Sequence, residues 1–167
     1  PDPELTLSDS DRETLTELAY ASIRHGLKHG KPLQYQVNAD TPAALQEPGA
    51  CFVTLKKTGQ LRGCIGSLEA RRPLATDVCD NAYAAAFRDP RFTALAEQEL
   101  DELELSISVL TPAAEIEFDS EQDLLGKIHA GTDGLILTDA GRRGTFLPSV
   151  WEQLPEPTDF LRHLKLK

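Results

Sequence analysis

Residues 61–66, with the sequence LRGCIG, combine a thiol, a guanidinium and two glycines within six positions. They lie in a β-rich stretch, where successive side chains point to opposite faces of the strand. Leu61 and Ile65 are apolar and are expected to face the core. We therefore predict that Arg62 and Cys64 share the more open face, about 6–7 Å apart. A guanidinium at that distance favours the thiolate form of cysteine, which acts as a nucleophile or metal ligand.

Three features of this segment leave its role open. Gly63 and Gly66 flank the cysteine, and glycine inside a strand marks a bulge or a place where a backbone or a ligand comes close. Cysteine is also among the most buried residue types and often acts only as a small apolar side chain. Arg62 could equally form an ion pair with an acid on a neighbouring strand, such as Glu104.

Other polar residues are further candidates for a site. Asp89 and Arg91, in the sequence DPRF, either lie at the rim of a binding cleft or form a local ion pair in the turn that ends a helix. His129 precedes a glycine-rich turn and is the histidine that we would test as a general base for Cys64.

Neither the histidines nor the cysteines make up a full set of metal ligands. His25 and His29 are four residues apart, which is the spacing of a two-histidine metal site, but no acidic or cysteine ligand lies at a supporting spacing, so we expect a solvated helix end. The three cysteines are Cys51, Cys64 and Cys79. This odd and sparse set predicts reduced thiols in the cytoplasm and not a disulfide framework. No cofactor is indicated by the sequence.

The composition is that of a folded soluble domain with an acidic surface. The net charge of −10 comes from 17 Lys and Arg against 27 Asp and Glu, which disfavours nucleic acid and anionic membranes as partners. No apolar run approaches the roughly 18 residues of a membrane span. The chain begins at Pro1 and contains no methionine, so we expect that its start has been processed or trimmed.

The order of the expected elements predicts an α+β fold with mostly antiparallel pairing and packed helices. Ser10 and Glu13 are expected to cap the first helix, and Trp151 is expected in the core. The expected elements are a helix over 10–29, a helical turn near 42–46, a hairpin of strands 51–55 and 60–66, a helix over 73–88, strands over 103–109 and 115–118, a helix over 120–128, a hairpin over 134–147 with its turn at 139–144, a helical turn near 150–154 and a last helix from 158. No βαβ rhythm or glycine-rich nucleotide loop is present.

LRGCIG resembles the signature hexapeptide of the AMMECR family, also called AmmeMemoRadiSam system protein A. Further blocks resemble that family in the same order, at 82–87, 89–92, 104–110, 131–134 and 145–151. The resemblance implies a two-lobed α+β fold, a large lobe plus a smaller one, with the hexapeptide lining the cleft between them. It implies no assigned reaction. Because family members usually continue into a further strand, we interpret 1–167 as a single AMMECR-like domain without that C-terminal strand.

The resemblance also implies possible partners, namely a Memo-like protein and a radical S-adenosylmethionine enzyme. One hypothesis is an enzyme-like cleft in which Cys64 is the nucleophile and Arg62 orients an anionic group of a small molecule or a modified protein. The other is a non-catalytic adaptor module that binds a partner protein. We slightly favour the first, because a glycine-lined polar strand face suits a small ligand. The residues predicted to line the cleft are Gly63, Gly66, Asp89, Arg91, Glu104 and Ser106.

Overall fold

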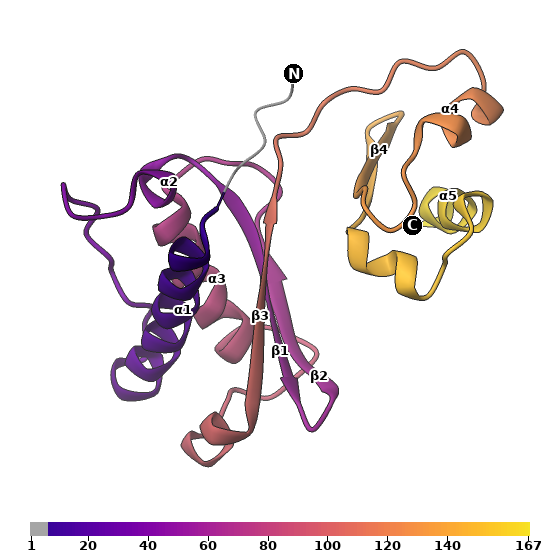
Figure 1. Cartoon of the computed structure of the whole chain (residues 1–167). Coiled ribbons are helices and arrows are strands. Elements are labelled where there is room, and N and C mark those ends of the chain that lie inside the picture. Colours follow the sequence, from indigo (N-terminus) through magenta and orange to yellow (C-terminus); the bar gives the residue numbers. More distant parts are fainter. Residues whose placement is uncertain (1–6) are drawn as a thin grey trace. The chain divides into compact units, whose positions relative to one another are not determined.

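The structure is a computed structural model that describes residues 7–167 as two compact units (Figure 1). The first unit extends to Ala113, and the second comprises Ala114–Lys167. Each unit combines helices with an antiparallel sheet, which confirms the predicted α+β class with a larger and a smaller part. The cleft that the resemblance implies stays a prediction.

The first unit is built around a three-stranded antiparallel sheet. Its strand order is β2-β1-β3, so β1 is central and the other two strands are edges. The elements of this unit are α1 (Asp9–His29), α2 (Ala43–Gln46), β1 (Ala50–Lys57), β2 (Gln60–Gly66), α3 (Leu74–Phe87), the 3-10 helix η1 (Glu97–Glu102) and β3 (Leu103–Leu110).

The N-terminus of α1 differs from the prediction. The capping box is formed by Ser8 and Asp11, whose side chains each accept a hydrogen bond from the other residue's backbone N–H at 3.0 Å. The helix therefore begins at Asp9, and Ser10 lies within its first turn. The sequence contains two overlapping pairs of serine and acid three residues apart, and the pair that occurs first forms the cap.

Helices α1 and α3 lie on the same side of the sheet (Figure 1). Val53 and Leu55 of β1 are fully buried against this helical layer, together with Ala82 of α3. The small alanines of α3 allow the helix to approach the sheet closely. The intervening β1 side chains, at Thr54 and Lys56, point to the opposite face and are more exposed. The sheet thus has one apolar face and one mixed polar face.

The second unit contains a two-stranded sheet and short helices. Trp151 stacks on Phe160 with ring centroids 3.7 Å apart, and its indole N–H donates to the Asp133 carbonyl at 2.7 Å. Trp151 is buried, which confirms its predicted place in the core. The elements are α4 (Glu121–Lys127), β4 (Leu135–Asp139), β5 (Arg142–Phe146), the 3-10 helix η2 (Pro148–Glu152) and α5 (Pro157–Leu166).

Two predictions for this region were wrong. The β4–β5 turn consists of only Ala140 and Gly141, both with positive φ, so Arg142 and Arg143 belong to the strand instead of a long turn. Such a two-residue turn matches the twist of the flanking strands. Residues 115–118 form no strand, because no neighbouring strand pairs with this short alternating run.

Within the described residues, no helix has both the length and the apolar character needed to cross a bilayer.

Candidate functional site

A β-bulge in the first hairpin changes the predicted faces of the hexapeptide. The β1–β2 register is regular from Gly66 to Gly63 and then skips one residue, so that Leu61 and not Arg62 pairs with Lys56. The extra residue reverses the alternation on one side of the bulge. Leu61 is consequently 42% exposed, although it was predicted in the core, and Arg62 is only 9% exposed, although it was predicted on the open face. Both face predictions were therefore wrong.

The Arg62 guanidinium binds Glu99 of η1. Its Nε and Nη2 donate to the two carboxylate oxygens, each at 3.1 Å, and Nη2 also donates to the Thr93 carbonyl at 2.9 Å. The hydrogen bond from Arg62 lowers the pKa of Glu99 to about 2. The expected alternative partner, Glu104, is not the one used. Sequence spacing could not identify Glu99, because an acidic run at 97–104 offers several similar carboxylates.

Cys64 does lie on the mixed polar face of the sheet. Its sulfur lies 3.3 Å from the Thr54 hydroxyl on β1, and the cysteine is partly exposed. Thr54 pairs with Cys64 on one side and with Ser106 of β3 on the other, so the three residues form a row across the sheet. Glu104 lies two residues before Ser106 on β3, in the next row on the same face, where it pairs with Lys56. The predicted residues Ser106 and Glu104 thus share a face with Cys64.

Asp89 and Arg91 meet the backbone of Cys64. The Cys64 N–H donates to the Asp89 carboxylate at 3.0 Å, and Arg91 Nη2 lies 3.5 Å from the Cys64 carbonyl oxygen. Arg91 also donates twice to Asp89, at 3.0 and 2.7 Å. These Arg91 hydrogen bonds, followed by those from backbone N–H groups, hold the pKa of Asp89 well below its ordinary range.

Arg91 is therefore the guanidinium located at Cys64, in the place that the sequence assigned to Arg62. The Asp89 side chain is 2% exposed, whereas the Arg91 side chain is 56% exposed. Of the two alternatives for this pair, the local ion pair is present and lies against the hexapeptide, whereas a place at the rim of a cleft stays a prediction. The side chain of Arg91 retains solvent access.

The two glycines of the hexapeptide are required by protein packing. A Cβ at Gly63 would overlap the carbonyl oxygen of Ala85, because α3 crosses β2 at this point. A Cβ at Gly66 would overlap the ring of Phe52, its partner on β1. The predicted close approach is confirmed at both positions, and the approaching groups are a helix backbone and an aromatic side chain.

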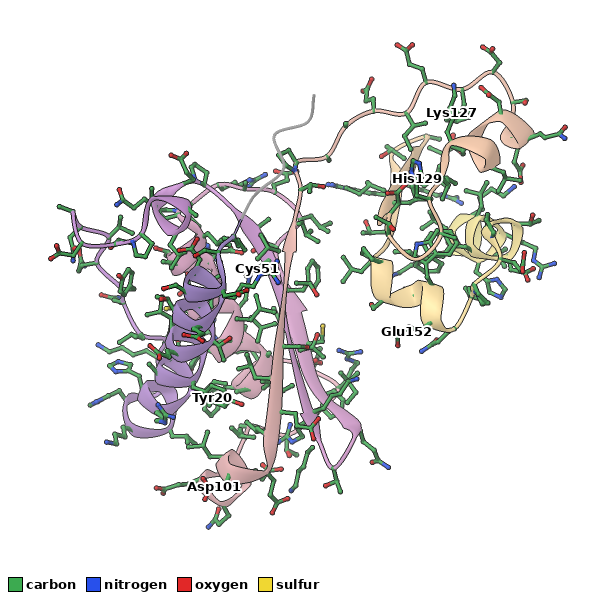
Figure 2. The ribbon with its side chains drawn as sticks, viewed as in Figure 1. Tyr20, Cys51, Asp101, Lys127, His129 and Glu152 are labelled. Carbon is green, nitrogen blue, oxygen red and sulfur yellow. The ribbon has the colours of Figure 1, made fainter. Side chains whose placement is uncertain are left out.

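A second polar cluster, which the sequence did not indicate, fixes α3 to β1. The buried Asp77 carboxylate accepts hydrogen bonds from the Cys51 N–H, the Ser67 hydroxyl, the Arg72 guanidinium and the Asn81 amide, at 2.8–3.0 Å. Burial raises the pKa of Cys51, whose position between the helices and the sheet is labelled in Figure 2. Burial also raises the pKa of Cys79 to about 12. These two thiols are therefore structural.

His129 belongs to the second unit, where Figure 2 labels it. Its Nδ1 lies 3.2 Å from the Asp133 carboxylate, and its side chain is 77% exposed. A role as the base for Cys64 stays a prediction. The rings of His25 and His29 lie 4.5 Å apart on α1, and no group of three potential metal ligands occurs among residues 7–167.

Two α+β units, with a cysteine-bearing edge strand bound by an Asp–Arg pair, define the structural class. Residues 16–167 match the AMMECR1 family, and the chain belongs to that family. A protein of Methanothermobacter thermautotrophicus is 38% identical over 144 residues, covering 86% of this chain and 74% of the relative. A protein of Methanopyrus kandleri is 36% identical over 172 residues, covering 98% and 79%. A solved structure, an uncharacterised protein from Pyrococcus horikoshii, matches with a TM-score of 0.86 and 35% identity, over 96% of this chain and 81% of that one.

Proposed function

We propose that the chain binds a small anionic molecule, or an anionic group on a modified protein, on the sheet face that carries Cys64. The observation that supports this most is the fixed position of Arg91. Its guanidinium is held by the buried Asp89 carboxylate at the Cys64 backbone, yet more than half of its side chain is exposed. A prepositioned cation loses little conformational entropy when it binds an anion.

The strand that Arg91 contacts also carries a thiol, which lies beside hydroxyl groups of the neighbouring strands. The Cys64 sulfur and the Thr54 hydroxyl are 3.3 Å apart, and the Ser106 hydroxyl continues the row. We propose that the site is enzyme-like, with Cys64 as the nucleophile and Arg91 as the residue that orients the anion. Arg62 binds Glu99 on the buried side of the strand, so Arg91 and not Arg62 is the proposed anion ligand.

Alkylation with iodoacetamide at neutral pH, followed by peptide mass mapping, tests this proposal. Cys64 should be modified first, because the other two thiols are fully buried. Inorganic phosphate should slow the modification of Cys64 in the wild-type chain and not in Arg91→Gln. Lys56→Gln, which removes an exposed cation from the next row of the same face, is the matched control and should retain the protection. Protection that is equal in the wild type and Arg91→Gln would exclude the proposed anion site.

An adaptor role is the second candidate, and one observation favours it. Leu61 is 42% exposed on the same face as Cys64, as expected of an apolar contact for a partner protein. The candidate partners are those implied by the family, a Memo-like protein and a radical S-adenosylmethionine enzyme. Co-purification should be weakened by Leu61→Ser but not by Gln60→Ser, its exposed neighbour. Equal recovery of both variants with either partner would argue against this role.

A further inference from the structure

Phe52 occupies the row of the sheet next to Cys64. It lies two positions before Thr54 on β1, so its side chain points to the same mixed polar face, and it pairs with Gly66 of β2 and Ser108 of β3. Successive rows on one face of a sheet are about 7 Å apart. An aromatic ring therefore borders the thiol on this face.

The backbone hydrogen bonds of the sheet alternate in direction along each strand. The Cys64 N–H points away from β1, to Asp89, so Thr54 and Cys64 are not a hydrogen-bonded pair of the antiparallel ladder. Thr54 directs its backbone groups to Ser106 on β3, and the β3 residues between such pairs, including Ile107, direct theirs away from the sheet. The side chains of β1 and β2 approach each other most closely at pairs of the Thr54–Cys64 kind.

The Phe52 ring lies flat over Gly66, which is the next pair of this kind along the two strands. A Cβ on Gly66 would be equally distant from the two Cδ atoms of the ring, at 2.5 Å, and only slightly nearer to Cγ. These similar distances place that point over the face of the ring, since a point in the ring plane would be much nearer to one of the three atoms. One face of the ring therefore packs on the glycine backbone, and the other is directed away from the sheet.

The outward face of the ring is not covered by another ring or by a cation. Phe52 is half-buried and packs into neither apolar core, and no aromatic or cationic side chain among residues 7–167 stacks on it. Polar groups lie nearby, since Ser106 and Ser108 are exposed on β3 and Arg91 contacts the Cys64 backbone. An aromatic surface with a few polar groups around it is typical of a small-molecule site.

We propose that the ligand of the Cys64 site carries a flat aromatic or heteroaromatic ring, which stacks on the outward face of Phe52. This inference rests on the proposed function, because Arg91 binds the anionic group of the same ligand. The ligand class is thus an aromatic carboxylate or an aromatic phosphate ester. Gly66 has a part in recognition as well as in packing, since any side chain at this position would lift the Phe52 ring from the sheet.

Protection of Cys64 from iodoacetamide by two phosphate esters tests for the ring. Phenethyl phosphate and cyclohexylethyl phosphate have the same charge and the same number of carbon atoms, and their two-carbon linker suits the spacing of about 7 Å between rows. In the wild-type chain the aromatic ester should give half-protection at a concentration about threefold lower, because ring stacking adds to the burial of apolar area. Inorganic phosphate, measured in parallel, reports on the anion site alone.

Three variants locate the ring contact. Phe52→Leu removes the aromatic face, and Gly66→Ala keeps the ring but displaces it, so the preference for the aromatic ester should disappear in both. Phe52→Tyr retains the ring and should retain the preference. Circular dichroism checks that each variant is folded, and the comparison of the two esters in the wild type requires no variant.

The outcomes separate this inference from the proposed function. Equal protection by the two esters in the wild type would overturn the ring contact, as would a preference that persists in Phe52→Leu. In either case the anion site would stand if inorganic phosphate still protects Cys64. Absence of protection by inorganic phosphate would exclude the anion site at Arg91, and this inference with it.

Discussion

The two edges of the three-stranded sheet differ in how their outward backbone groups are used. On β2, the outward N–H of Cys64 donates to Asp89, and Arg91 approaches the outward carbonyl. On β3, the outward groups around Ile107 have no partner among the described residues. Charged side chains over an edge prevent strand addition, whereas an uncovered edge invites it. One sheet thus has an edge whose outward groups are bound by an Asp–Arg pair and an edge whose outward groups have no partner within residues 7–167.

The path of the chain explains why β2 is the covered edge. Helix α3 packs on β2 at Gly63, and the segment that follows this helix returns along the strand. Asp89, which is two residues beyond the end of the helix, therefore lies at Cys64. The connection that directly follows α3 thus supplies Asp89 and Arg91, the charged cover of β2. Within residues 7–113, no corresponding loop follows the outward side of β3.

The largest expected effect tests the assignment of inward and outward groups on β3. Ser106→Pro removes a hydrogen bond from the β1–β3 ladder and leaves its acceptor on β1 unpaired, so it should destabilise the chain by about 3 kcal/mol. Ile107→Pro, one residue later, should cost no more than Ile107→Ala, because its N–H is outward. Urea unfolding followed by circular dichroism measures both differences. A similar loss for the two proline variants would show that the edge assignment is incorrect.

The next effect tests the close contact that positions the covered edge. Gly63→Ala introduces a methyl group against the Ala85 backbone, which can move only if α3 shifts, and should destabilise by about 3 kcal/mol. Gly66→Ala meets the Phe52 side chain, which can rotate, and should cost about 1 kcal/mol. Thermal unfolding of the two variants compares them directly. If Gly66→Ala were the more damaging, backbone packing of α3 would not be the constraint on this strand.

A smaller effect separates the two members of the charged cover. Asp89→Ala leaves the Cys64 N–H without its acceptor in a buried position and should destabilise by about 2 kcal/mol. Arg91→Gln removes a largely exposed charge and should cost less than about 1 kcal/mol. Chemical denaturation measures the two costs. Equal losses would mean that Arg91, and not the carboxylate, secures the edge.

The sequence was sufficient for the class of fold and for the first hairpin. A turn at 57–59 between two β-rich runs predicted the β1–β2 pair, and alternation along 103–109 predicted β3 as a strand. The pairing of β3 with β1 was not predicted, since the expected contact between Arg62 and Glu104 placed it beside β2. The family resemblance also brought the DPRF and LRGCIG segments together as candidates, and they do make contact. These features depend on short-range patterns that one sequence contains.

The roles of the two arginines could not be predicted in the same way. A one-residue bulge placed Arg62 on the buried side, and nothing in a period-two pattern signals where such a bulge occurs. Arg91 reaches the backbone of Cys64 because the connection that follows α3, more than twenty residues further along the chain, returns to the strand. Contacts of this kind depend on tertiary packing and not on local alternation.

The last expected effect concerns acid stability and the same covered edge. The folded-state pKa of Glu99, about 2, lies below its unfolded value of about 4.3, and that of Asp89 is also lowered. Each carboxylate therefore contributes stability that is fully present above its unfolded pKa and is lost as the pH falls toward the folded pKa. The free energy of unfolding should decrease between about pH 5 and pH 2.

The variant Glu99→Gln should be less stable at neutral pH but should show a shallower decrease in the free energy of unfolding, so that its curve approaches that of the wild type near pH 2. Glu104→Gln, on the exposed face of β3, is the control and should run parallel to the wild type. A Glu99→Gln curve that stays parallel to the wild type would show that the Arg62–Glu99 pair does not support the edge.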